Sequence, residues 1–140
     1  MNLDKLFKDR KLRKIEPDLE KVKSSLETSE KKISEAKSLF DSEFFNQVIL
    51  SAYTSMFHAA RALLYGDGVQ EKSHYAVYVY LESKYYDKLP MGLLNSFYNY
   101  QNSRKELLYG FDYEANKEDA EGAINDARKF LEEVKKIGTL

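Results

Sequence analysis

The chain of 140 residues contains no cysteine, two prolines and only two histidines. The lack of cysteine excludes a disulfide scaffold, a thiolate metal site and a cysteine nucleophile. Two histidines are too few for a histidine-rich metal centre, and neither belongs to the paired Glu-x-x-His pattern of di-metal helical bundles. Calcium loops and glycine-rich phosphate loops are also missing from the sequence. We therefore expect neither a metal nor a cofactor.

Long apolar runs are missing as well. No segment approaches the roughly 18 consecutive apolar residues of a membrane span, and the first residues lack the apolar stretch of a signal peptide. These patterns predict a cytoplasmic protein without a membrane partner. The sequence also has no internal repeat, low-complexity tract or linker rich in glycine, serine and proline, so we expect a single domain.

The net charge of the whole chain is close to zero, but the charges are unevenly distributed along the sequence. The formal net charge is -1, whereas residues 1–14 carry six basic side chains against two acidic ones. Such a segment can contact phosphates or an acidic partner through nonspecific electrostatics. The alternative is a solvated first helix. We therefore divide the chain into residues 1–16, a basic N-terminal arm or short helix, and residues 17–137, a helical bundle.

Apolar residues recur at the three- and four-residue spacing of amphipathic helices in five segments. The first segment is 17–38. The second begins after Asp41, which can cap it, and ends near Gly66, and the third is 73–86 with Ser73 as N-cap. The fourth runs from Pro90 to Gly110, and the last follows Asn116. Residues 77–80 alternate as a strand does, but we assign them to a helix because their neighbours offer no pairing strand. The pattern predicts an all-α fold, an antiparallel up-and-down four-helix bundle with an additional C-terminal helix.

The residue types that best suit a binding or catalytic role lie near the end of the fourth helix. An arginine fork can bind phosphate bidentately, so Arg104 together with Tyr109 is the candidate catalytic pair. Nearby amides that can bond a ribose or base are Asn99, Gln101 and Asn102. On a straight helix Arg104 and Tyr109 point about 140° apart, so convergence needs a long side chain or unwinding before Gly110. The alternative is an Arg104 ion pair within the bundle and a Tyr109 packed at the helix end.

The second helix adds His58 and Arg61 as candidate nucleotide- or RNA-binding residues. A histidine beside an apolar helix face also suits a role in helix packing. Eleven tyrosines are present, nine of them between residues 75 and 113. Aromatic rings stack on exposed bases, but they also fill cores and interfaces, and we favour the latter for most of them.

Three segments resemble HEPN domains over roughly residues 25–135: SAYTSMFHAARALL, GVQEKSHYAV and SRKELLYGFDY. The resemblance implies that residues 17–137 are a HEPN-like bundle. Many members of that family are metal-independent ribonucleases, in which an arginine is followed after four to six residues by a histidine and two copies face each other across a dimer. Arg104 matches the arginine, but residues 109–111 are Tyr-Gly-Phe, so the motif histidine is missing.

The version with tyrosine in place of histidine is similar to HEPN proteins that are paired with minimal nucleotidyltransferases in toxin–antitoxin modules. In those modules the partner can nucleotidylate the region of the motif tyrosine. The resemblance therefore implies a homodimeric, nucleotide- or RNA-binding partner of such an enzyme, with Tyr109 as modification acceptor or site residue. We expect the second to fourth helices to form the dimer interface. One alternative is a ribonuclease that uses Arg104 with Tyr109 or His58 in a composite dimer site, and another is a non-catalytic helical scaffold.

Overall fold

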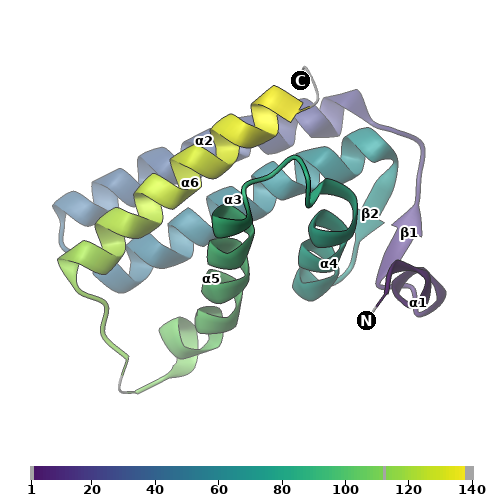
Figure 1. The fold of residues 1–140 in the computed structure, drawn as a ribbon. Helices are drawn as coiled ribbons and strands as arrows, with labels where there is room; N and C mark the ends of the chain where they lie inside the picture. The colour runs from purple at the N-terminus through teal and green to yellow at the C-terminus, as the bar shows by residue number, and fades with distance from the viewer. Residues whose placement is uncertain (1, 112, 138–140) are drawn as a thin grey trace.

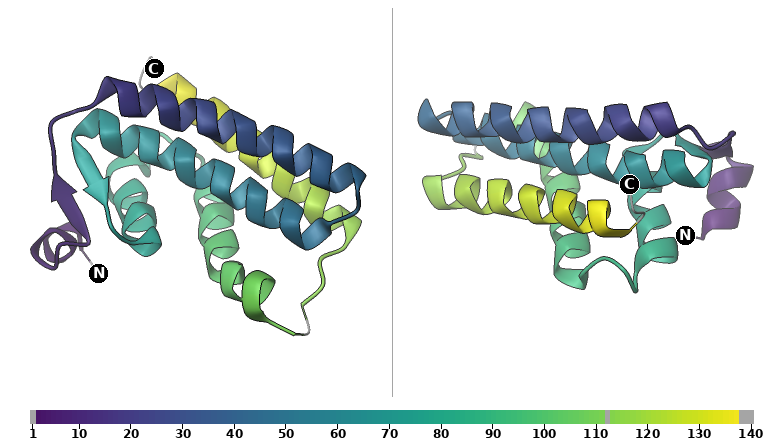
Figure 2. Two further views of the ribbon diagram at one scale, coloured as in Figure 1. Left: turned by 180° about the vertical axis from the view of Figure 1, so that it is seen from behind. Right: turned by 90° about the horizontal axis from the view of Figure 1, so that it is seen from above.

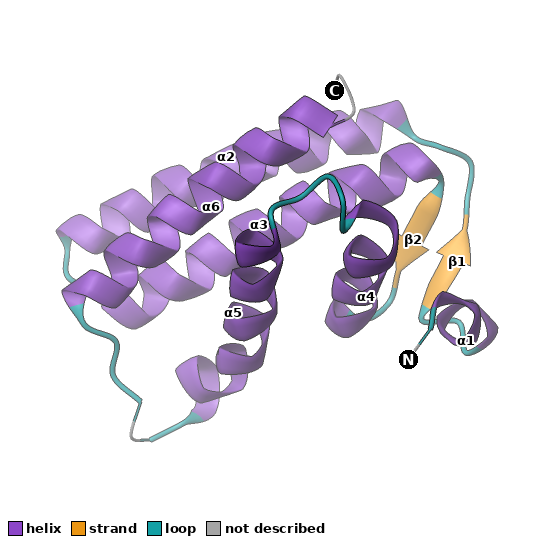
Figure 3. Ribbon diagram, viewed as in Figure 1, coloured by secondary structure: helices purple, strands orange, loops and turns teal. Residues whose placement is uncertain are grey.

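Helices dominate the structure, a computed structural model that describes residues 2–111 and 113–137. The prediction of an all-α fold is confirmed, with only two three-residue strands among the described residues (Figures 1 and 3). The elements are α1 (Leu3–Lys8), β1 (Leu12–Lys14), α2 (Leu19–Asp41), α3 (Phe45–Asp67), β2 (Val69–Glu71), α4 (His74–Tyr85), α5 (Met91–Tyr109) and α6 (Lys117–Ile137). No helix in this described part is both long and apolar enough to cross a membrane.

The long helices α2, α3 and α6 lie side by side, and α4 and α5 run across them on one side (Figures 1 and 2). The chain follows α4 in one direction and returns along α5 after a short turn. Helix α3 is in contact with α2, α4, α5, α6 and β2. It is therefore the central helix, as its broad apolar face predicts.

Small residues bring α2 and α3 close together. Ser29 and Ser55 are both fully buried, and each hydroxyl donates to the backbone carbonyl oxygen of the other residue at 2.8 Å. Because each buried hydroxyl finds an acceptor on the facing helix, the two serines cost little desolvation energy. On the other side of α3, the rings of Tyr53, Phe97 and Phe130 pack in sequence from α3 through α5 to α6. This aromatic column is the part of the core on which the candidate site rests.

Most predicted helix ends agree with the structure, but one cap does not. Ser73 caps α4 as predicted, since its Oγ accepts a hydrogen bond from the Ala76 N–H at 3.0 Å. Asp41 was predicted to begin the second helix and instead is the last residue of α2. The chain reverses in the next three residues, where Glu43 has a positive φ of 63°, and α3 begins at Phe45 without a side-chain cap.

The assignment of residues 77–80 to a helix is confirmed, since they lie in α4, but the sequence analysis missed a short pair of strands that precedes this helix. Strands β1 and β2 form an antiparallel ladder in which Leu12 faces Glu71 and Lys14 faces Val69. Gly68 ends α3 in the left-handed conformation with φ 77°, and a Cβ there would lie 2.7 Å from the Ile15 carbonyl oxygen. A glycine is therefore required for the close approach that joins the N-terminal segment to β2.

Candidate functional site

The first residue of α4, His74, is held against α3 by two aromatic side chains. Its Nδ1 lies 2.7 Å from the hydroxyl of Tyr53, a residue that is 2% exposed. The imidazole also stacks on the Phe57 ring, with ring centroids 4.2 Å apart. The Ser73 cap fixes the backbone immediately before it. These contacts orient the ring of a half-buried histidine, an arrangement that is typical of functional sites.

Arg104 reaches the same place from α5. It follows Phe97 by seven residues, so the two side chains leave the helix from nearly the same face. Phe97 stacks on Tyr53 with ring centroids 5.6 Å apart, which directs that face toward α3. The positive charge of Arg104 acts on the pKa values of both His74 and Tyr53. The structure therefore places Arg104 within electrostatic range of His74 and Tyr53, two residues that the sequence analysis did not include in the site.

Arg61 closes the site on the side of β2. Its Nε donates to Glu71 Oε1 at 2.8 Å, and its terminal amine donates to the Tyr65 hydroxyl. The guanidinium also lies over the rings of Phe57 and Tyr65, 5.7 and 5.1 Å from their centroids. Because the Glu71 carboxylate already accepts a hydrogen bond from the Arg61 guanidinium, Arg61 is better placed to shape the site than to bind phosphate directly.

Charge and burial keep the His74 imidazole neutral. Burial lowers the pKa of His74, and the positive charges of Arg104 and Arg61 lower it further. Burial raises the pKa of the Tyr53 hydroxyl, which Arg104 opposes. A neutral tyrosine hydroxyl can either donate a hydrogen bond to Nδ1 or accept one from an Nδ1–H. In the first case Nε2 carries the proton and is a hydrogen-bond donor, and in the second Nε2 is free to act as a base. The pair thus offers both binding and proton transfer beside an arginine.

The structure does not bring Tyr109 to Arg104. Helix α5 continues without unwinding to Tyr109, so the two side chains point about 140° apart. Tyr109 is 77% exposed, next to the exposed Leu108 and Phe111. The unwinding before Gly110 that would allow convergence does not occur, because the helical hydrogen bonds extend to the Gly110 N–H, which donates to the Glu106 carbonyl oxygen at 2.9 Å.

The three candidate amides of α5 do not form one cluster. Asn99 and Asn102 are exposed, whereas Gln101 is partly buried and its Oε1 has no hydrogen-bond partner within the described residues. Asn99 lines a hollow of about 310 Å³ that also contains Glu118 and Asp119. Carboxylates repel phosphate, so this hollow is a poor extension of the Arg104 site.

His58 lies apart from Arg104. It is half-buried, and its pKa is lowered by burial first and then by Arg61 and by Lys32 of α2. The influence of Lys32 indicates that this histidine faces α2, whereas His74 is influenced by Arg104 of α5. Of the two histidines in the sequence, the structure therefore favours His74 as the site residue.

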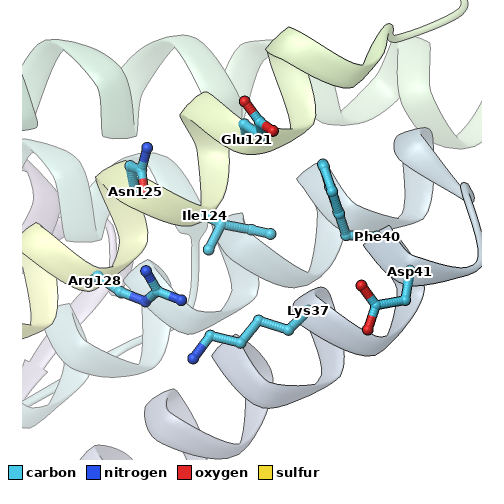
Figure 4. A pocket seen from close by; sticks show the side chains of 7 residues that line it. All are labelled: Lys37, Phe40, Asp41, Glu121, Ile124, Asn125 and Arg128. Carbon is cyan, nitrogen blue, oxygen red and sulfur yellow. The ribbon is translucent and has the colours of Figure 1, made fainter.

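A separate pocket of about 440 Å³ lies between α2 and α6 (Figure 4). Its lining residues are Lys37, Phe40, Asp41, Glu121, Ile124, Asn125 and Arg128. Both charge signs are present, and none of the candidate residues from the sequence lines it. Over residues 2–111 and 113–137, no three histidine or acidic side chains gather as a metal would require.

The family of HEPN domains matches residues 22–137 of this chain. Two similar proteins of Methanocaldococcus jannaschii are each named "Putative toxin". One is 27% identical, covering 84% of this chain and 88% of the relative, and the other is 30% identical, covering 94% and 86%. A "UPF0332 protein" of Archaeoglobus fulgidus is 28% identical, covering 84% of this chain and 94% of the relative.

Proposed function

Because this chain belongs to the HEPN family, we propose that it is a toxin-type HEPN protein that binds RNA or a nucleotide and is paired with a minimal nucleotidyltransferase in the cytoplasm. The names of the two Methanocaldococcus relatives support the toxin-type role. The observation that supports the binding role is that Arg104, on the face of α5 that packs on Tyr53, lies within electrostatic range of the His74 imidazole that Tyr53 holds in place.

Arg104 suits phosphate because no carboxylate of the described residues pairs with its charge. Within residues 2–111 and 113–137 it forms no ion pair with a carboxylate, in contrast to Arg61. A phosphate that accepts bonds from the Arg104 fork can also accept one from the His74 Nε2–H. The neutral imidazole adds this donor without adding a second positive charge that would repel the guanidinium.

Replacing Arg104 with alanine is expected to weaken RNA binding roughly ten- to hundredfold, because the charge-assisted hydrogen bonds to one phosphate are lost. The measurement is fluorescence anisotropy with a short single-stranded RNA of mixed sequence, in chelator and at a fixed salt concentration. Arg128→Ala is the matched control, since it removes an exposed arginine of α6 from the separate pocket. Equal affinities of the parent protein and Arg104→Ala would contradict the proposed site.

The partner enzyme is expected to modify Tyr109. The tyrosine hydroxyl lies on a residue that is 77% exposed at the end of α5, where an enzyme can reach it. Coexpression with an active minimal nucleotidyltransferase from the same genome, followed by intact mass measurement, should show a nucleotide adduct that Tyr109→Phe removes. An unchanged mass with a partner proven active would rule out this modification, and an adduct that persists in Tyr109→Phe would move the acceptor elsewhere, for example to Tyr113.

The homodimer is part of the same proposal. The end of α5 and the chain after it expose several apolar side chains, with Leu108 at 45%, Tyr109 at 77% and Phe111 at 101%. Contiguous exposed apolar side chains commonly mark an interface. A second copy that covers them would contact the end of α5, which is one of the helices expected to form the dimer interface. A nucleotide on Tyr109 and a second copy on this surface would therefore exclude each other.

A second candidate function is metal-independent endoribonuclease activity, which His74 specifically favours. The family motif histidine is missing from residues 109–111, but the structure supplies an imidazole beside Arg104 from another helix. Nε2 of His74 would take the proton of a ribose 2′-hydroxyl as that oxygen attacks the adjacent phosphorus. The bond from phosphorus to the 5′-oxygen then breaks, the leaving oxygen takes a proton from water, and the products are a 2′,3′-cyclic phosphate and a 5′-hydroxyl. Arg104 would bind the charged phosphate oxygens.

A further inference from the structure

A second group of basic side chains surrounds a pocket of about 370 Å³ at the N-terminal end of the fold. Its lining residues are Phe7, Arg10, Leu12, Arg13, Lys14 and Lys72. We call the four cations among them, Arg10, Arg13, Lys14 and Lys72, the basic cluster. No acidic side chain lines the pocket, and within the described residues none of the four cations forms an ion pair.

The arm that carries three of these cations has a fixed place on the protein. Leu6 and Leu12 are 2% and 0% exposed, so both ends of the turn between α1 and β1 are packed into the core. The turn itself places Arg10 in the left-handed region with φ 60°, an uncommon conformation for a residue with a Cβ. The Lys72 N–H then donates to the Lys11 carbonyl oxygen at 2.9 Å, which joins the arm to the segment after β2.

The basic cluster and the Arg104 site are connected by a very short piece of chain. Lys72 belongs to the cluster, and His74, two residues later, belongs to the site. Two residues of extended chain span at most about 7 Å between their Cα atoms. A ligand with a repeated negative charge can therefore contact both places at once.

We propose that the basic cluster binds the sugar–phosphate backbone of a single-stranded RNA whose neighbouring phosphate lies at Arg104 and His74. This inference rests on the RNA binding proposed above and adds the course of the strand to it. Four cations without a carboxylate repel one another, and phosphates that neutralise them release bound counterions. RNA suits the surface better than an acidic protein does, because the cluster continues into a site with an arginine and an imidazole, the groups that bind phosphate.

The test is the salt dependence of RNA binding by the full chain. The triple variant Arg10→Gln, Arg13→Gln and Lys72→Gln should bind a mixed-sequence single-stranded RNA at least tenfold more weakly at low salt. The slope of log affinity against log salt should decrease by about 2, since each lost phosphate contact on a single strand contributes about 0.7. A double variant, Lys14→Gln with Lys72→Gln, leaves the Arg10 turn intact and should show a smaller change of the same sign.

The matched control removes the same total charge elsewhere, with Lys23→Gln, Lys31→Gln and Lys129→Gln on exposed positions of α2 and α6. An equal loss in this control, or an unchanged slope in the cluster variant, overturns the proposal. If Arg104→Ala weakens RNA binding but the cluster variant binds RNA as tightly as the parent, this proposal is overturned while the proposed function stands. If the parent chain binds no RNA and the cluster instead binds an acidic protein, both the proposed function and this inference fail.

Discussion

Replacing His74 with asparagine is expected to lower metal-independent RNA cleavage by about a hundred- to ten-thousand-fold, the usual contribution of a general acid or base. Under the ribonuclease proposal, His74 is the proton acceptor, and asparagine keeps a polar side chain but cannot take the proton. RNA binding should change only a few-fold, because Arg104 still holds the phosphate. Cleavage of a mixed RNA pool in chelator measures the first quantity, and anisotropy measures the second.

The pH dependence of cleavage separates a catalytic His74 from a structural one. Burial and the charges of Arg104 and Arg61 lower the pKa of His74, so the neutral, basic form persists to lower pH than for an exposed histidine. The rate should therefore rise with pH, reach half its maximum below the ordinary pKa of histidine and stay level above it.

Tyr53→Phe should lower both the rate and the pH of this midpoint, because the hydroxyl that accepts a hydrogen bond from the Nδ1–H stabilises the imidazolium. Tyr80→Phe is the control, since it removes another buried tyrosine hydroxyl, one that donates to Asp67 at 2.9 Å outside the site. A parent protein that does not cleave RNA, or a His74→Asn protein that cleaves it equally well, would leave the Arg104 site with a binding role alone.

Phe97→Ala is expected to decrease the free energy of unfolding by about 3–5 kcal/mol, the range for truncating a large buried aromatic residue. The ring of Phe97 is 0% exposed and lies between Tyr53 and Phe130, at 5.6 and 5.4 Å between ring centroids. Its removal leaves a cavity at the crossing of α3, α5 and α6, and it also removes the support beneath Tyr53. Urea unfolding followed by circular dichroism measures the change.

The control for this prediction is Phe111→Ala, which truncates the same side chain at a position that is 101% exposed. Its effect on the stability of the monomer, measured at a protein concentration below that of dimer formation, should stay within about 0.5 kcal/mol, as for other surface substitutions. Similar decreases in the free energy of unfolding of the two variants would mean that the aromatic column through Phe97 does not stabilise the fold as its burial implies.

The helices could be predicted from the sequence because their signals are local. Ser73 before α4 and Gly68 after α3 act through bonds to backbone groups within a few residues, and the apolar positions repeat at helical spacing. The ladder of β1 and β2 could not be predicted, since strands of three residues show no alternation. Their pairing depends on Gly68 meeting the carbonyl oxygen of Ile15, more than fifty residues earlier in the chain.

The candidate site also has features that the sequence predicts and others that only the structure shows. The sequence by itself determined the helical class, the family resemblance and the choice of Arg104 as a candidate residue, because these depend on periodicity, residue type and a short motif. It could not show that Tyr109 points away from Arg104 on an unbroken helix, nor that His74 takes the place beside it. Arg104 and His74 are thirty residues apart on different helices, and only the packing of α4 and α5 against Tyr53 of α3 brings them together.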